Sequence, residues 1–339
     1  MDDPTVKPER LRAMSEQPRV LAEAIRGDED LGRLSLLPGT WKSVGGGWNM
    51  IALPYVPSGD LNYRLLLNQY DEQLNFALVD KAAANRGIDD GVTRQTDQFV
   101  VTLGYEQVIQ QVAVIDRPAS AAQGAINATI HHEPGLFLQL LNQTSDGLEV
   151  ARLASVPHGV SALALGSSSV VEGIAPIPHT TGFPEGAGTD IGNSYLEPYR
   201  FFRDHPFMGK VATPGFPGFN PLEPCRLLAH ANEGLTVTRT TVLDFDTRHS
   251  TGGIHNIPFV VEQANAVSMT STFWIHELAD PENHGNHRLR MQYLQVVDLE
   301  FGARLDGAPG LIGWPHISIN TLDKVSDTLL PFGDSGSLG

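Results

Sequence analysis

The sequence predicts an all-β protein: an antiparallel barrel of about ten strands, with an N-terminal helical arm and a long irregular insertion. Strand-like runs rich in β-branched and aromatic residues recur between turn residues, as in RLLLNQYDEQLNFALVD and LTVTRTTVLDFDT. No helical period separates them after residue 30. A barrel with an insertion accounts for all 339 residues as one domain.

The elements follow in order along the chain. Residues 1–30 are predicted to form the arm, with an amphipathic helix near Glu9 to Arg26. Residues 31–325 form the barrel domain. Its first strand contains Gly45, Gly46 and Gly47, which indicate a sharp bend where backbones approach closely rather than a phosphate-binding loop, because no helix follows.

The strand pattern is interrupted at about 172–232, a stretch rich in Pro, Gly and aromatic residues. Long loops are unusual in compact domains and often serve as lids or binding elements. A lid and an oligomer contact are both open at this point. Residues 326–339 are polar and are expected to form a flexible tail.

Composition excludes several classes of function. The formal net charge is −16, from 39 acidic and 23 basic residues, which disfavours nucleic acid and anionic membranes as partners. A single cysteine excludes an intrachain disulfide framework. No signal peptide and no apolar run of about 20 residues is found. We therefore expect a cytoplasmic protein without a membrane span.

His316 is the most informative single residue, because it stands at the start of a strand-like run directly after a proline. Such a rigidly aimed imidazole suits an axial metal ligand. Strand alternation places Ser318 on the same face, where its small side chain leaves room for a flat ligand, and places Ile317 and Ile319 on the other face. The isoleucines must then be covered by the insertion or by a second subunit, which leaves a homo-oligomer open.

Several motifs occur in one order along the chain: LPGTWKSVGGG, GYEQ, HHEPGL, ASVPHGVSALALG, LRMQYLQV and PHISINTL. This series resembles the nitrobindin-like family of haem-binding barrels, calycins related to fatty-acid-binding proteins. The resemblance implies a calycin-like ten-stranded barrel that binds haem b, with His316 as the ligand of the iron. The chain is about twice the usual length of the family, and His158 stands where the family has threonine.

Other residues receive roles from this resemblance. His158 is a candidate acid–base group beside the haem, and His179 in the insertion is the alternative. Lys42 and Arg152 are candidates for pairing with the haem propionates. Trp41 and Trp48 are expected to wall the core near the first bend of the barrel, and Trp41 is also a candidate residue of the haem site.

The adjacent residues His131 and His132 point to opposite faces of a strand and cannot easily share a metal ion. The functional hypothesis is therefore a haem peroxidase that uses hydrogen peroxide on a small organic, aromatic substrate. Two alternatives remain: a nitric oxide-binding or haem-carrier protein without turnover, and a haem-free carrier similar to fatty-acid-binding proteins.

Overall fold

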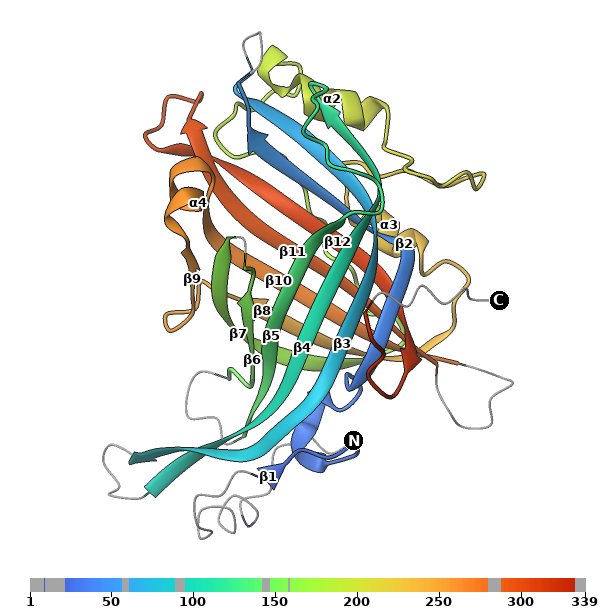
Figure 1. The fold of residues 1–339 in the computed structure, drawn as a ribbon, viewed down its shortest axis with the longest axis vertical. Helices are drawn as coiled ribbons and strands as arrows, with labels where there is room; N and C mark the ends of the chain where they lie inside the picture. The colour runs from blue at the N-terminus through green and yellow to red at the C-terminus, as the bar shows by residue number, and fades with distance from the viewer. Residues whose placement is uncertain are drawn as a thin grey trace.

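Ten antiparallel strands close into a barrel in the computed structural model, which describes residues 9, 22–56, 61–88, 95–141, 147–157, 159–279 and 288–332 (Figure 1). The order around the barrel is β3-β2-β12-β11-β10-β8-β7-β6-β5-β4, and β4 pairs with β3 to close it. The strands are β2 (Gly39–Pro54), β3 (Tyr63–Ile88), β4 (Gln95–Arg117), β5 (Thr129–Leu141), β6 (Val150–Ser155), β7 (Val160–Glu172), β8 (Val237–Asp246), β10 (Asn265–Leu278), β11 (Arg288–Ala303) and β12 (Leu311–Ser326). The predicted barrel is confirmed.

The predicted N-terminal helix is not confirmed. Within its range, Ala22–Glu23 form a short strand, β1, which pairs with Lys81 and Asp80 of β3, and Arg26 lies in a turn. Strand pairing supplies backbone hydrogen-bond partners that a helix would otherwise provide internally. Apart from Glu9, residues 1–21 lie outside the described part of the chain.

An aromatic core fills the end of the barrel near β1, which is the lower end in Figure 1. We call this core the lower core. Trp41, Phe76, Phe137 and Phe273 are buried there, in a cluster to which all ten barrel strands contribute side chains. The 3-10 helix η1 (Glu29–Leu34) packs against this core with the fully buried side chains of its leucines. This end of the barrel is therefore closed.

A second core lies on the outer face of β2, β3 and β12, under the insertion. The insertion begins after β7 ends at Glu172 and finishes before β8 begins at Val237, close to the predicted limits. It is not structureless, since it contains η2 (Ser194–Leu196), α2 (Glu197–Asp204) and α3 (Arg226–His230). Its aromatic residues contact the barrel wall, where the ring of Phe219 stacks on Trp48 with centroids 6.1 Å apart.

The insertion also covers Ile317 and Ile319, which are 0% and 1% exposed and belong to this outer core. The prediction that these isoleucines face away from His316 and need an outer cover is confirmed, and the insertion provides that cover. The remaining elements are β9 (Gly253–Asn256), which pairs with β7, and α4 (Pro258–Gln263). No helix in the described residues is long and apolar enough to cross a membrane.

The glycine run in β2 forms the predicted irregularity. Gly45 has φ +64°, a left-handed conformation, and the pairing of β2 with β3 changes register between Ser43 and Gly47. A Cβ atom at Gly47 would lie 2.0 Å from Cε2 of Tyr70. Only glycine allows this close approach.

The start of the predicted C-terminal tail is attached to the barrel. The carbonyl oxygen of Leu330 accepts hydrogen bonds from Gln73 Nε2 and Asn75 Nδ2, both at 2.9 Å. Residues 333–339 lie outside the described part of the chain.

Candidate functional site

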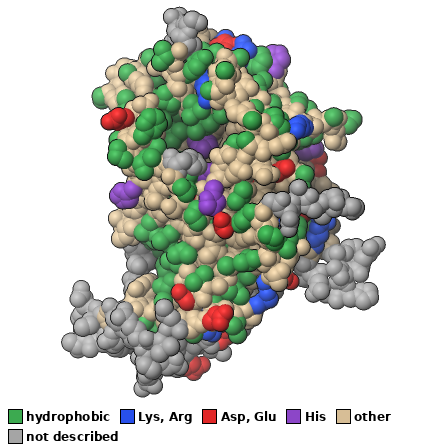
Figure 2. Space-filling view, viewed as in Figure 1, with side chains coloured by type: hydrophobic (Ala, Val, Ile, Leu, Met, Phe, Trp, Pro, Cys, Tyr) green, Lys and Arg blue, Asp and Glu red, His purple; other side chains and the backbone are tan. Residues whose placement is uncertain are grey.

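A cavity of about 390 Å³ occupies the barrel interior above the lower core. This volume lies within the usual range of small-molecule sites. Figure 2 shows a hollow in the upper half of the molecule that is bordered by hydrophobic side chains. The cavity is lined by Asn49, Ile51, Leu53, Leu66, Asn68, Leu74, Phe76, Tyr105, Gln107, Ile109, Gln111, Gln123, Ile130, His131, Phe137, Arg152, Phe273, Tyr293, Gln295, His316 and Ser318.

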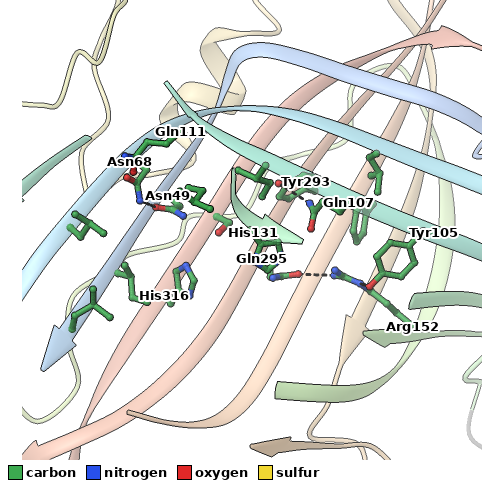
Figure 3. A pocket seen from close by; sticks show the side chains of 18 of the residues that line it. Asn49, Asn68, Tyr105, Gln107, Gln111, His131, Arg152, Tyr293, Gln295 and His316 are labelled. Atoms are coloured by element: carbon green, nitrogen blue, oxygen red, sulfur yellow. Dashed lines mark hydrogen bonds between the residues drawn. The ribbon is translucent and has the colours of Figure 1, made fainter. Parts of the chain in front are cut away.

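His316 lies on the cavity wall, where β12 places it beside Ser318, as predicted (Figure 3). Its Nε2 atom is buried and has no hydrogen-bond partner among the described residues. Burial, together with a smaller electrostatic effect of the nearby His131, lowers the pKa of His316 to about 4. The imidazole is therefore neutral near pH 7, which is the form that ligates a metal.

His131 is the functional candidate that the sequence analysis did not select. It lines the cavity from β5, whereas its neighbour His132 is exposed and contacts Glu106 at 2.9 Å. The two histidines thus point to opposite faces, as expected. Strands β5 and β12 are four strands apart in one direction and six in the other, so His131 and His316 face the cavity from opposite walls.

A buried ion pair supports His131. Glu133 Oε2 lies 3.3 Å from His131 Nε2, and Glu133 Oε1 accepts a hydrogen bond of 2.7 Å from Arg152 Nη2. Burial alone would raise the pKa of Glu133, but the charge of Arg152 and hydrogen bonds from His131 and Tyr105 hold it well below its usual value. Glu133 is therefore a carboxylate, suited to orient the imidazole of His131.

A second buried carboxyl group lies below the cavity. Glu72 accepts hydrogen bonds from Tyr293 Oη at 2.6 Å, Gln107 Nε2 at 2.7 Å and Asn320 Nδ2 at 2.7 Å. Burial raises the pKa of Glu72, and these hydrogen bonds oppose that effect. Because Tyr293 and Gln107 line the cavity, this network fixes the orientation of polar groups on its floor.

The structure places the other predicted site residues in three different environments. Arg152 lines the cavity, but its charge is already neutralised by Glu133, because a buried charge needs a counter-ion, so its predicted pairing with propionates is not favoured. Trp41 belongs to the lower core rather than to the cavity wall, and its Nε1 donates to the carbonyl oxygen of Leu37 at 2.8 Å. Lys42 follows Trp41 on β2 and so lies on the outward face.

Of the two predicted distal histidines, only His179 belongs to the described residues, and it does not line the cavity. His179 is exposed on the insertion, and no residue of 172–232 lines the cavity, because the insertion packs on the outer wall of the barrel. The insertion is therefore not a lid over this site. His158 lies outside the described residues.

The described residues contain no group of three or more His, Cys, Asp or Glu side chains that could hold a metal ion. A metal that brings most of its own ligands, as haem iron does, needs a single histidine. Among the described residues, the cavity presents one histidine with an unpartnered ring nitrogen, the Nε2 of His316.

The sequence matches no protein-family model and no curated protein. Among solved structures, it is similar to the crystal structure of Rv2717c from M. tuberculosis, with a TM-score of 0.34 and 14% sequence identity. The match covers 87% of this chain and 96% of that chain.

Proposed function

We propose that the barrel cavity binds haem b, with His316 as the residue that would ligate the iron. The observation that carries this proposal is the buried Nε2 of His316, which has no hydrogen-bond partner among the described residues although the imidazole lines a cavity. A buried polar atom without a partner is costly and calls for a ligand. Its low pKa keeps the imidazole available for a metal at neutral pH.

The neighbours of His316 are compatible with a flat prosthetic group. Ser318, on the same side of β12, is small, and Ile51 and Leu66 provide apolar walls nearby. When bound, a histidine-ligated haem provides a metal centre for diatomic ligands or peroxide. The reaction class that we propose is a peroxidase acting on hydrogen peroxide and a small organic substrate.

His131 takes the acid–base role in this proposal. It faces the cavity from the wall opposite His316, and the carboxylate of Glu133 lies within contact distance of its Nε2. A histidine oriented by a carboxylate can accept a proton from one oxygen atom of a bound ligand and return it to another. Binding of nitric oxide without turnover is the alternative, since it needs His316 but no acid–base group.

The proposal is tested by the visible spectrum of the purified protein after addition of haem. The wild type should show a Soret band that titrates to one haem per chain. His316→Ala should lose most of it while keeping the β-sheet circular dichroism spectrum. His132→Ala is the matched control, since this exposed histidine points away from the cavity.

An unchanged Soret band in His316→Ala would remove His316 from this role. A wild type that takes up no haem would contradict the proposal as a whole and favour a haem-free carrier. Stopped-flow reaction with peroxide then separates the two haem functions, because a nitric oxide binder should react only slowly.

A further inference from the structure

Strand register aligns polar side chains in one row across the cavity wall. Ser271 of β10 is opposite Gln295 of β11, and Gln295 is opposite Ser318 of β12. Ser318 is opposite Asn49 of β2, and Asn49 is opposite Asn68 of β3. We call these five residues the polar row. It crosses five adjacent strands, and four of its members line the cavity (Figure 3).

The polar row lies one pleat below His316. Ser318 follows His316 by two residues on the same face, which corresponds to about 7 Å along a strand. The step from His316 to Ser318 leads towards the closed end of the barrel. Strand β12 continues from Ser318 to Lys324, which is paired with Trp41 of the lower core. The row is therefore deeper in the barrel than the proposed iron ligand.

Aromatic side chains form the next layer down. Phe273 and Tyr293 follow the row by one pleat on β10 and β11 and are paired with each other. Their ring centroids are 5.6 Å apart. Phe137, which also lines the cavity, contacts Phe273 with ring centroids 5.5 Å apart, and Phe76 and Tyr105 contact Phe137 in turn. The deep end of the cavity thus presents aromatic faces and edges beneath a belt of amide and hydroxyl groups.

The charge that contacts the row, that of Arg152, is compensated within the protein. Arg152 Nη1 donates to Gln295 Oε1 at 2.7 Å and to Ser271 Oγ at 3.1 Å, and its Nη2 pairs with Glu133. Its Nε donates to Tyr105 Oη at 3.3 Å. An anionic ligand would find the charge of Arg152 already paired with Glu133, so burying that ligand here would be unfavourable.

One member of the row has a free acceptor. Asn68 is 4% exposed and lines the cavity, and its Nδ2 donates to Asn49 Oδ1 at 3.0 Å. Its Oδ1 has no hydrogen-bond partner among the described residues. A buried carbonyl oxygen of this kind is normally paired, so a ligand with a hydrogen-bond donor would complete it.

We propose that the polar row and the aromatic layer form a binding subsite for a small uncharged phenol. Its ring packs on the aromatic layer, and its hydroxyl donates to Asn68 Oδ1. The subsite does not depend on the haem. If the proposed function holds, the subsite places an organic substrate on the closed side of His316.

The test is calorimetric binding of phenol, toluene and benzoate to the purified full-length protein. Phenol and toluene have the same number of heavy atoms, but toluene lacks the donor. Phenol should bind roughly 10-fold more tightly than toluene, the factor for one buried hydrogen bond. Benzoate, which brings an uncompensated charge, should bind more weakly than both.

Asn68→Leu should reduce the preference for phenol over toluene by roughly 10-fold, because it removes the acceptor at nearly constant volume. Asn85→Leu is the matched control: it makes the same change at an exposed position of the same strand and should leave the preference unchanged. The comparison of the three ligands on the wild type remains decisive if Asn68→Leu does not fold.

Equal binding of toluene and phenol to the wild type, or an unchanged preference in folded Asn68→Leu, would overturn the inference. Tighter binding of benzoate than of phenol would also overturn it. These results are read from heats of binding, whereas failure of the haem proposal is read from the Soret band, so the two failures are distinguishable.

Discussion

Glu133 and Arg152 form an ion pair inside the barrel, with 2.7 Å between Glu133 Oε1 and Arg152 Nη2 and with side chains that are 2% and 3% exposed. The pair links two parts of the cavity. Glu133 contacts His131, and Arg152 donates to Gln295 of the polar row. Its integrity therefore affects both the proposed acid–base group and the proposed phenol subsite.

Replacing Glu133 with Gln should destabilise the protein at neutral pH by about 3–5 kcal/mol, because it leaves the buried charge of Arg152 without a counter-charge. The pKa of Glu133 is lowered on folding, so its stabilisation is present above the unfolded-state pKa of about 4.3 and is lost as the pH falls towards the folded-state pKa. The difference from wild type should narrow below about pH 4.3.

Urea denaturation at neutral pH and at two acidic values checks this prediction. Glu106→Gln serves as the control, since this exposed carboxylate is paired with the exposed His132 and its substitution should change stability by less than about 0.5 kcal/mol. A difference in the free energy of unfolding between wild type and Glu133→Gln that does not change with pH would contradict this prediction. It would show that the side chain of Glu133 stabilises the protein by packing rather than by its charge.

His316→Gly should lose haem and regain it when imidazole is added. The substitution opens space beside the cavity, and free imidazole can supply the missing ring nitrogen. The measurement is a haem titration by Soret absorbance with and without imidazole. Restoration of the band would assign the loss to the ligand rather than to a damaged barrel, whereas haem binding by His316→Gly without imidazole contradicts the assignment.

His131→Gln should lower the rate of reaction with peroxide by roughly 100- to 10,000-fold, the range for a lost acid–base group, with haem content unchanged. His179→Gln should react like the wild type, because His179 is exposed and outside the cavity. Stopped-flow measurements on haem-loaded proteins provide the rates. Equal rates for His131→Gln and wild type would show that His131 is not the acid–base group.

Trp48→Ala should destabilise the protein by about 3–5 kcal/mol and loosen the insertion. Trp48 is 3% exposed and contacts Phe207, Phe216 and Phe219 from the outer wall of the barrel. Urea denaturation measures the loss, and limited proteolysis should detect faster cleavage between residues 205 and 220. Val44→Ala, at a 78% exposed position of the same strand, should alter neither.

Gly47→Ala should lower the free energy of unfolding by about 1–3 kcal/mol or more, because the added Cβ atom would lie 2.0 Å from the ring of Tyr70. Gly253→Ala is the comparison, since the nearest atom to a Cβ at that glycine is His255 Nε2 at 4.0 Å. Thermal unfolding of the two variants checks the difference. Similar melting temperatures would mean that the bend in β2 can relax at little cost.

The sequence by itself determined the features that depend on short-range periodicity. Alternation along one strand placed His316 and Ser318 on one face and Ile317 and Ile319 on the other, and it separated His131 from His132. The recurrence of such runs predicted the barrel. The N-terminal helix was not confirmed, because pairing of Ala22 and Glu23 with β3 is a long-range contact that local pattern does not contain.

Only the tertiary structure decided which side chains meet inside the barrel. That Arg152 pairs with Glu133, that His131 and His316 line the cavity from opposite walls, and that the insertion packs on the outer wall all depend on how the strands pair and close. The polar row depends on register across five strands, and a shift of one residue in any pairing would turn its members outward. Register is set by packing of the whole barrel, so no single run of sequence specifies it.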